Sequence, residues 1–117
     1  MIWPDVVQVA MEVEDGVDTR GNPKYKWINE PVRGQVVALD TDAVLSASRD
    51  AVITRYRVAL APALDIPADV GNGLKVGWGV YPLVDRTSDL RVDGSVERHM
   101  VRGRLHHYEF IVRQILG

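Results

Sequence analysis

Three histidines near the carboxyl end of the chain are the residues best suited to hold a metal ion. His106 and His107 are adjacent, and His99 lies shortly before them. Neighbouring side chains on a strand point to opposite faces, so one site could use only one of the adjacent pair unless the strand carries a bulge. No carboxylate stands at a sequence spacing that would complete a tetrahedral set of ligands. We therefore expect no metal site and no other cofactor, and histidines that lie at the surface or at an interface.

Catalytic chemistry finds little support among the serines and aspartates. No serine lies in the strand–turn–helix context that exposes a nucleophile. Asp85 with Asp89 or Asp93 could form a carboxylate pair of the kind used in hydrolysis. These residues lie in a turn-rich segment, where Asp is favoured because its side chain bonds its own backbone. The sequence predicts no catalytic residues and a protein that is not an enzyme.

The elements that would position such side chains are strands, because apolar residues recur at every second position. Val7, Val9, Met11 and Val13 form the first such series, which is typical of a half-buried strand. Further strands are expected at 25–29, 32–39, 52–61, 75–84, 89–96 and 105–116. No segment keeps a helical period beyond about two turns. The sequence predicts an all-β fold, a small β-barrel or sandwich of about six to seven strands with one long loop.

Three features interrupt the predicted strands. Pro31 is expected to separate the strands on either side of it, since proline cannot donate to a sheet ladder. Asp93-Gly94 is a strong signal for a two-residue hairpin turn. The alternation lapses between Asp40 and Asp50, and we expect one long loop there with little structure of its own. Loops of that length are usually functional or mobile.

The composition is that of one soluble domain. The 117 residues and 46% apolar content suit a single core, and we expect one β-barrel domain over residues 1–117. Cysteine is absent, which excludes disulfides and thiolate metal sites. The amino terminus is not that of a signal peptide, and no apolar stretch approaches the roughly 20 residues of a membrane helix. The net charge of −2 argues against bulk nucleic-acid affinity.

Several short motifs follow one another in a definite order. They are Asp18-Thr19-Arg20-Gly21-Asn22-Pro23, Trp27, Pro31-Val32-Arg33-Gly34, Val52-Ile53-Thr54-Arg55-Tyr56-Arg57-Val58, Asp65-Ile66-Pro67-Ala68-Asp69, Val92-Asp93-Gly94 and Gly103-Arg104-Leu105-His106-His107-Tyr108-Glu109. In order, spacing and total length the chain resembles the head-to-tail stopper, or head-closure, proteins of long-tailed bacteriophages, especially those of actinobacterial hosts. The chain departs from that family by an insertion-like stretch at 83–91.

The resemblance implies a virion structural protein of the phage neck, assembled in the host cytoplasm. Such proteins form a homo-oligomeric ring, typically of about twelve copies, and a closed ring needs complementary faces on one domain. The ring lies below the portal and adaptor rings, closes the DNA-filled head and offers the platform on which the tail terminator or tail tube docks. Packaged DNA passes through its channel without specific binding, and no membrane is involved.

The resemblance also implies that the loop between residues 40 and 50 faces the central channel, where the corresponding loop of related proteins can gate the exit of DNA. With three aspartates and one arginine, the loop would repel phosphates and let DNA slide. The residues expected at the channel are Asp40, Thr41, Asp42, Ser46, Ser48, Arg49 and Asp50.

Contacts with neighbouring copies or with the ring above are expected from the amino terminus and the basic final part of the chain. Aromatic residues and arginine dominate interface energies. The candidates are Ile2, Trp3, Arg98, Arg102, Arg104, His106 and His107. Alternatively, Arg102 and Arg104 only flank a hairpin loop.

Two other functions stay open. The chain could be another neck or tail protein, either an adaptor, which tends to be rich in helix, or a tail terminator, which usually mixes helices with a sheet. It could also be a free-standing β-barrel module that binds a small ligand or an oligonucleotide, and such a module would be monomeric and stabilised by its ligand.

Overall fold

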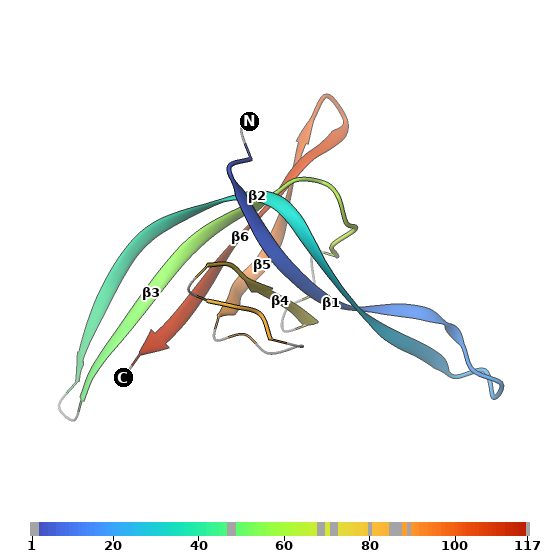
Figure 1. Ribbon diagram of the computed structural model, residues 1–117, viewed down its shortest axis with the longest axis horizontal. Coiled ribbons are helices and arrows are strands. Elements are labelled where there is room, and N and C mark those ends of the chain that lie inside the picture. Colours follow the sequence, from blue (N-terminus) through green and yellow to red (C-terminus); the bar gives the residue numbers. More distant parts are fainter. Residues whose placement is uncertain are drawn as a thin grey trace.

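The computed structural model of the chain describes residues 3–46, 49–67, 70, 73–79, 81–84, 88 and 90–116 (Figure 1). Within these ranges, the side chains of 40–46, 49–53 and 115–116 are not described. No helix in the described part of the chain has the length and hydropathy needed to cross a bilayer.

Six antiparallel strands form one sheet. They are β1 (Asp5–Val17), β2 (Pro23–Ser46), β3 (Arg49–Leu60), β4 (Leu74–Gly77), β5 (Arg91–Val101) and β6 (Arg104–Leu116). Their order across the sheet is β4-β1-β2-β3-β6-β5. The predicted all-β fold of about six strands is confirmed.

The sheet is arched, but it does not close into a barrel. Its two edge strands, β4 and β5, come into contact with each other. No ladder of hydrogen bonds joins them within the described residues, so the sheet keeps two edges. The architecture is therefore an open, curved sheet, and of the two predicted arrangements the β-barrel is not closed.

The core lies on the concave side of the arch, where β4 and the segment after it pack beneath the central strands (Figure 1). The alternation predicted from the sequence points the right residues inward, because every second side chain of a strand faces the same side. Buried side chains of the long strands include Val7, Val9, Met11, Val32, Val58, Leu60, Val96, Tyr108, Phe110 and Val112. The same core cluster includes Leu74 and Val76 of β4, with Ile66 and Leu90 from the connections between strands.

Two hairpins extend well beyond this core (Figure 1). We call residues 12–30 the β1–β2 arm and residues 40–54 the β2–β3 arm. The radius of gyration is 16.1 Å, against about 13 Å for a compact domain of similar length. A straight strand of the 24 residues in β2 would be about 80 Å long, whereas the longest dimension of the molecule is 54 Å. β2 must therefore bend, and its register with β3 shifts between Ala38 and Thr41.

Pro31 lies within β2 and does not break it, contrary to the prediction. It is opposite Gln8 of β1. On its other side β2 has no neighbour at this point, because pairing with β3 begins only at Gly34. A missing N–H is tolerated where one side of the strand is unpaired. β2 therefore continues past Pro31 without a break.

The hairpin signal at Asp93-Gly94 marks an irregularity inside β5 and not a turn. The register between β5 and β6 shifts between Asp93 and Glu97, and Gly94 has a φ of +89°. Gly in the left-handed region is typical of bulges as well as of hairpin turns. The turn that joins β5 to β6 is instead at Arg102-Gly103, where both residues have positive φ, 52° and 76°.

The segment from Asp40 to Asp50 was predicted to be a long loop and is the outer part of a hairpin. Residues 40–46 continue β2, and Arg49 and Asp50 begin β3, with Ser46 opposite Arg49. Ser48 falls outside the described residues. The predicted strand at 75–84 is also shorter than expected, since β4 ends at Gly77 and the chain turns tightly so that Trp78 pairs with Tyr81.

Three aromatic rings join this tight turn to the central strand β3. Tyr56 packs edge-on against Trp78 at 5.4 Å and against Tyr81 at 5.6 Å between ring centroids. The hydroxyl oxygens of the two tyrosines are 2.9 Å apart and share a hydrogen bond. This bond, with burial and repulsion from an ionised Tyr81, raises the pKa of Tyr56 from 10.0 to about 12.

We expect the tyrosine pair to make stability depend on alkaline pH. A folded-state pKa above the unfolded value stabilises the neutral form, so the contribution is complete below pH 10 and is lost as the pH rises to 12. In a Tyr81→Phe variant the pKa of Tyr56 should fall toward 10, because its main cause is gone. NMR of protein labelled at tyrosine Cζ, titrated from pH 9 to 11.5, tests this, because Tyr56 should stay mostly neutral at the upper limit in the wild type and be mostly ionised there in the variant. An unchanged Tyr56 midpoint in the variant would contradict the assignment.

Candidate functional site

The β5–β6 hairpin carries all three histidines, and a bulge decides how they meet. Met100 is opposite Leu105, but His99 is opposite His107. One extra residue, His106, therefore sits on β6 between these two pairs, which is the arrangement of a β-bulge. Without it, His99 would lie opposite His106.

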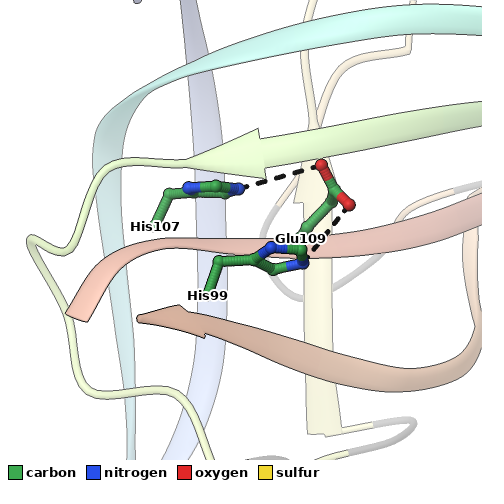
Figure 2. Close-up of side chains that lie close together, drawn as sticks. All are labelled: His99, His107 and Glu109. Carbon is green, nitrogen blue, oxygen red and sulfur yellow. Dashed lines mark ion pairs between the residues drawn. The ribbon is translucent and has the colours of Figure 1, made fainter. Parts of the chain in front are cut away.

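His99 and His107 lie side by side across the two strands, with Glu109 beyond them on β6 (Figure 2). The two imidazole rings are stacked, with centroids 4.5 Å apart and planes 19° from parallel. The Glu109 carboxylate is 3.4 Å from His99 Nε2 through one oxygen and 3.8 Å from His107 Nε2 through the other. We call His99, His107 and Glu109 the His–Glu cluster.

A second carboxylate borders the His–Glu cluster. Glu97 is directly opposite Glu109, and its Oε1 lies 2.8 Å from His99 Nε2. Like charges placed opposite each other on paired strands are destabilising. The imidazole of His99 between the two carboxylates offsets this repulsion when it is protonated.

The bulge brings His106 to the same side as His107, so that their Nδ1 atoms are 2.8 Å apart. A His107 that donates its Nδ1–H to His106 keeps the lone pair of Nε2 directed at the cluster. Trp3 packs over both rings, at 6.4 Å from His106 and 6.2 Å from His107 between centroids. The His107 side chain is thereby held from two directions.

Burial lowers the pKa of His107 below its ordinary value of 6.5. The neighbouring His99 and His106 act in the same direction, whereas Glu109 opposes them. His107 is only 8% exposed, and a charged imidazole in such a place is costly. A neutral His107 offers a lone pair, which is the form that binds protons and metals.

No carboxylate was expected at a spacing that completes a tetrahedral set, yet the structure brings Glu109 close to His99 and His107. Residues two apart on a strand face the same side, so His107 and Glu109 form a ligand pair that the His-x-Glu spacing could have indicated. The approach of His99 to this pair was harder to predict, because it depends on the turn at Arg102-Gly103 and on the bulge at His106. Neither has a strong sequence signal.

A shallow hollow of about 280 Å³ adjoins the cluster where β5 is irregular. It is smaller than a typical ligand pocket, which starts at about 300 Å³. Its walls carry three carboxylates and one guanidinium, so the local field is negative. The lining residues are Arg57, Asp93, Gly94, Ser95, Glu97, Glu109, Phe110 and Ile111.

The structure describes six of the seven predicted interface residues. Trp3, His106 and His107 come together at one end of the β5–β6 hairpin. Arg102 and Arg104 are exposed at its turn, next to the exposed Met100 and Val101. Ile2 lies outside the described residues.

Arg98 has partners within its own chain. Its guanidinium donates to the Ile66 carbonyl at 3.2 Å and lies over the Tyr108 ring at 5.4 Å. The Tyr108 hydroxyl in turn accepts the Ile66 N–H at 3.1 Å. Arg98 therefore helps to fix the connection after β3 to the core, and an interface role for it stays a prediction.

The two arms are the other surfaces on which binding of a partner would add stability. In the described residues, the β1–β2 arm has no third strand beside it, since β4 pairs only as far as Met11 and β3 ends opposite Gly34. Val17 and Tyr25 near its tip are 62% and 61% exposed. As far as the structure describes the chain, the β2–β3 arm is two-stranded beyond the pair that Val52 makes with Leu116 of β6. Isolated two-stranded ribbons are marginally stable in water.

No family model, no curated protein and no solved structure matches this chain. Fold and site together define an open, arched β-sheet protein with two projecting hairpin arms and a His–Glu cluster on a third hairpin.

Proposed function

We propose that this chain is a structural subunit of the neck of a long-tailed bacteriophage. It forms a ring below the portal and adaptor, closes the DNA-filled head and provides the platform on which the tail docks. The ring is a homo-oligomer, of about twelve copies by resemblance, with closed rotational symmetry. The protein is part of the virion, at the neck between head and tail, and its role is structural and not enzymatic.

The observation that carries the proposal is the β2–β3 arm. The segment 40–50, which the resemblance to head-closure proteins assigns to the channel, is a hairpin that projects from the sheet (Figure 1). A projecting hairpin on each subunit of a ring can reach the axis while the arched sheets form the wall. Its three aspartates and one arginine favour a surface from which DNA phosphates are repelled.

The β1–β2 arm supports assembly with further copies of the chain. A ribbon of this length with exposed Val17 and Tyr25 gains stability when a neighbouring subunit covers it. A contact between an arm and a different surface of the next copy is heterologous, and such contacts generate rings when the rotation closes. Exposed Met100 and Val101 at the β5–β6 turn offer a second apolar contact.

The rival functions fit the fold less well. Adaptors and tail terminators contain substantial helix, whereas the described residues contain no α-helix. A module that binds a small ligand inside a β-barrel needs a closed or deeply cupped sheet, and the hollow beside the His–Glu cluster is shallow and charged.

An amber mutation in this gene, introduced in the parent phage, tests the proposal by electron microscopy of the lysate. We expect free tails beside heads that have lost their DNA, because the exit is left unclosed and undocked. Supplying the wild-type chain from a plasmid should restore complete virions. Normal virions from the amber mutant would overturn the proposal, and full heads with aberrant tails would place the protein in the tail instead.

A further inference from the structure

The His–Glu cluster has the chemistry of a transition-metal site. Imidazole nitrogen and carboxylate oxygen are ligands that zinc prefers in proteins, at about 2.0–2.2 Å. The three donor groups lie within 4.8 Å of one another and come from two hydrogen-bonded strands. We propose that His99, His107 and Glu109 bind a zinc ion. This inference stands apart from the proposed neck function, since it depends only on the cluster.

The distances between the donor atoms suit tetrahedral coordination. Ligand atoms about 2.1 Å from a tetrahedral metal are roughly 3.4 Å from one another. Glu109 Oε2 is 3.4 Å from His99 Nε2, and Glu109 Oε1 is 3.8 Å from His107 Nε2. The three donors lie within 4.8 Å of one another, so side-chain rotations must bring the widest pair closer before all three reach one ion.

The surroundings hold the donors in place before any ion arrives. His107 is buried, and its Nδ1 faces the Nδ1 of His106 at 2.8 Å, which directs Nε2 toward Glu109. Metal-binding histidines are usually oriented by such a bond through the other ring nitrogen. His99 and Glu109 are fixed to the same stretch of ladder by the bulge.

The negative charge around the cluster and its access to solvent also favour a bound cation. Glu97 and Glu109 face each other across the strands, and a divalent cation relieves the repulsion between them. The hollow beside them opens to solvent and carries the same two carboxylates. Glu97 or a water molecule is therefore available for a fourth position.

Zinc binding is tested on the purified full chain without a histidine tag, treated with a chelator. We expect calorimetry with zinc chloride to give saturable binding of one ion per chain, and cobalt(II) to give the visible absorption bands of a tetrahedral site. His99→Ala removes a half-exposed ligand and should weaken binding by more than about 100-fold, beyond the effect of changing an orienting residue. Glu14→Gln removes a carboxylate from the β1–β2 arm and should leave binding unchanged.

Imidazole NMR gives a readout that needs no variant. Zinc should shift the ring resonances of His99 and His107 together, with the same midpoint as the calorimetric titration. If the chain binds no zinc, or binds it equally well after His99→Ala with the fold intact by circular dichroism, the proposal is wrong and the cluster is a set of imidazole–carboxylate ion pairs.

Discussion

Replacing Gly77 with alanine is expected to destabilise the protein by about 3 kcal/mol, at the upper end of what overpacking costs. A Cβ at this position would lie 2.5 Å from the amide nitrogen of Leu83 and 2.6 Å from the carbonyl oxygen of Tyr81. Both contacts are with backbone, so no side-chain rotation relieves them. The tight turn after β4 must move away, and with it the aromatic rings that pack against Tyr56.

Gly73→Ala is the matched control, since Gly73 lies just before the same short strand. A Cβ there meets only a methyl group of Val70, at 3.5 Å, which is an ordinary contact. We expect no loss of stability, and a slight gain because alanine restricts the unfolded chain. Urea denaturation followed by tryptophan fluorescence measures both variants. Equal midpoints for Gly77→Ala and wild type would show that the turn yields without cost.

Shortening the β2–β3 arm is expected to abolish DNA retention if the proposed neck function holds. Replacing residues 44–51 with Asn-Gly leaves the Ala43–Val52 pair closed by a two-residue turn. Every pair between β3 and β6 stays, because that ladder begins at Val52. The ring should assemble, but its channel should lack the hairpins that block the exit, so plaque formation should be lost.

Three measurements distinguish a loss of DNA retention from a failure of the shortened chain to fold or to join the head. Circular dichroism of the purified variant should match the wild type, and an immunoblot of purified heads should detect the variant chain. Electron microscopy should then show heads without DNA. Heads that carry the variant and keep their DNA would rule out the arm as the gate, whatever the position of the ring.

Much of the fold could be predicted because most strands pack on a core. Val7, Val9 and Met11 alternate in sequence and are buried in the structure, as are Tyr108 and Phe110. Burial on one face imposes a period of two on the sequence, and the period is visible without coordinates.

The β2–β3 arm could not be predicted in this way. Beyond the end of β6 it is a two-stranded ribbon, so no core selects alternate apolar residues there. Ala43, Val44 and Leu45 follow one another, and the segment 40–50 therefore looked like a loop. Strands that project from a domain lose the signal by which strands are usually found.

The His–Glu cluster was missed for a different reason. Its three residues are close in sequence, but their union depends on the register between β5 and β6, and one bulged residue shifts that register by one position. A slip of one residue sends every side chain of a strand to the other face. Residue spacing could have indicated the pair on β6, but it could not indicate the partner on β5.

The position of β6 in the sheet governs how the chain folds during synthesis. β1, β2 and β3 are consecutive in sequence and in the sheet, so they can pair as they leave the ribosome. The core cannot close at that stage, because Val58 in β3 pairs with Phe110 in β6, which is made later. Until then β3 presents an unpaired edge with apolar side chains, a state that aggregates readily. Nascent chains stalled before residue 104 should therefore bind chaperones, and release of the carboxyl-terminal strand should end that dependence.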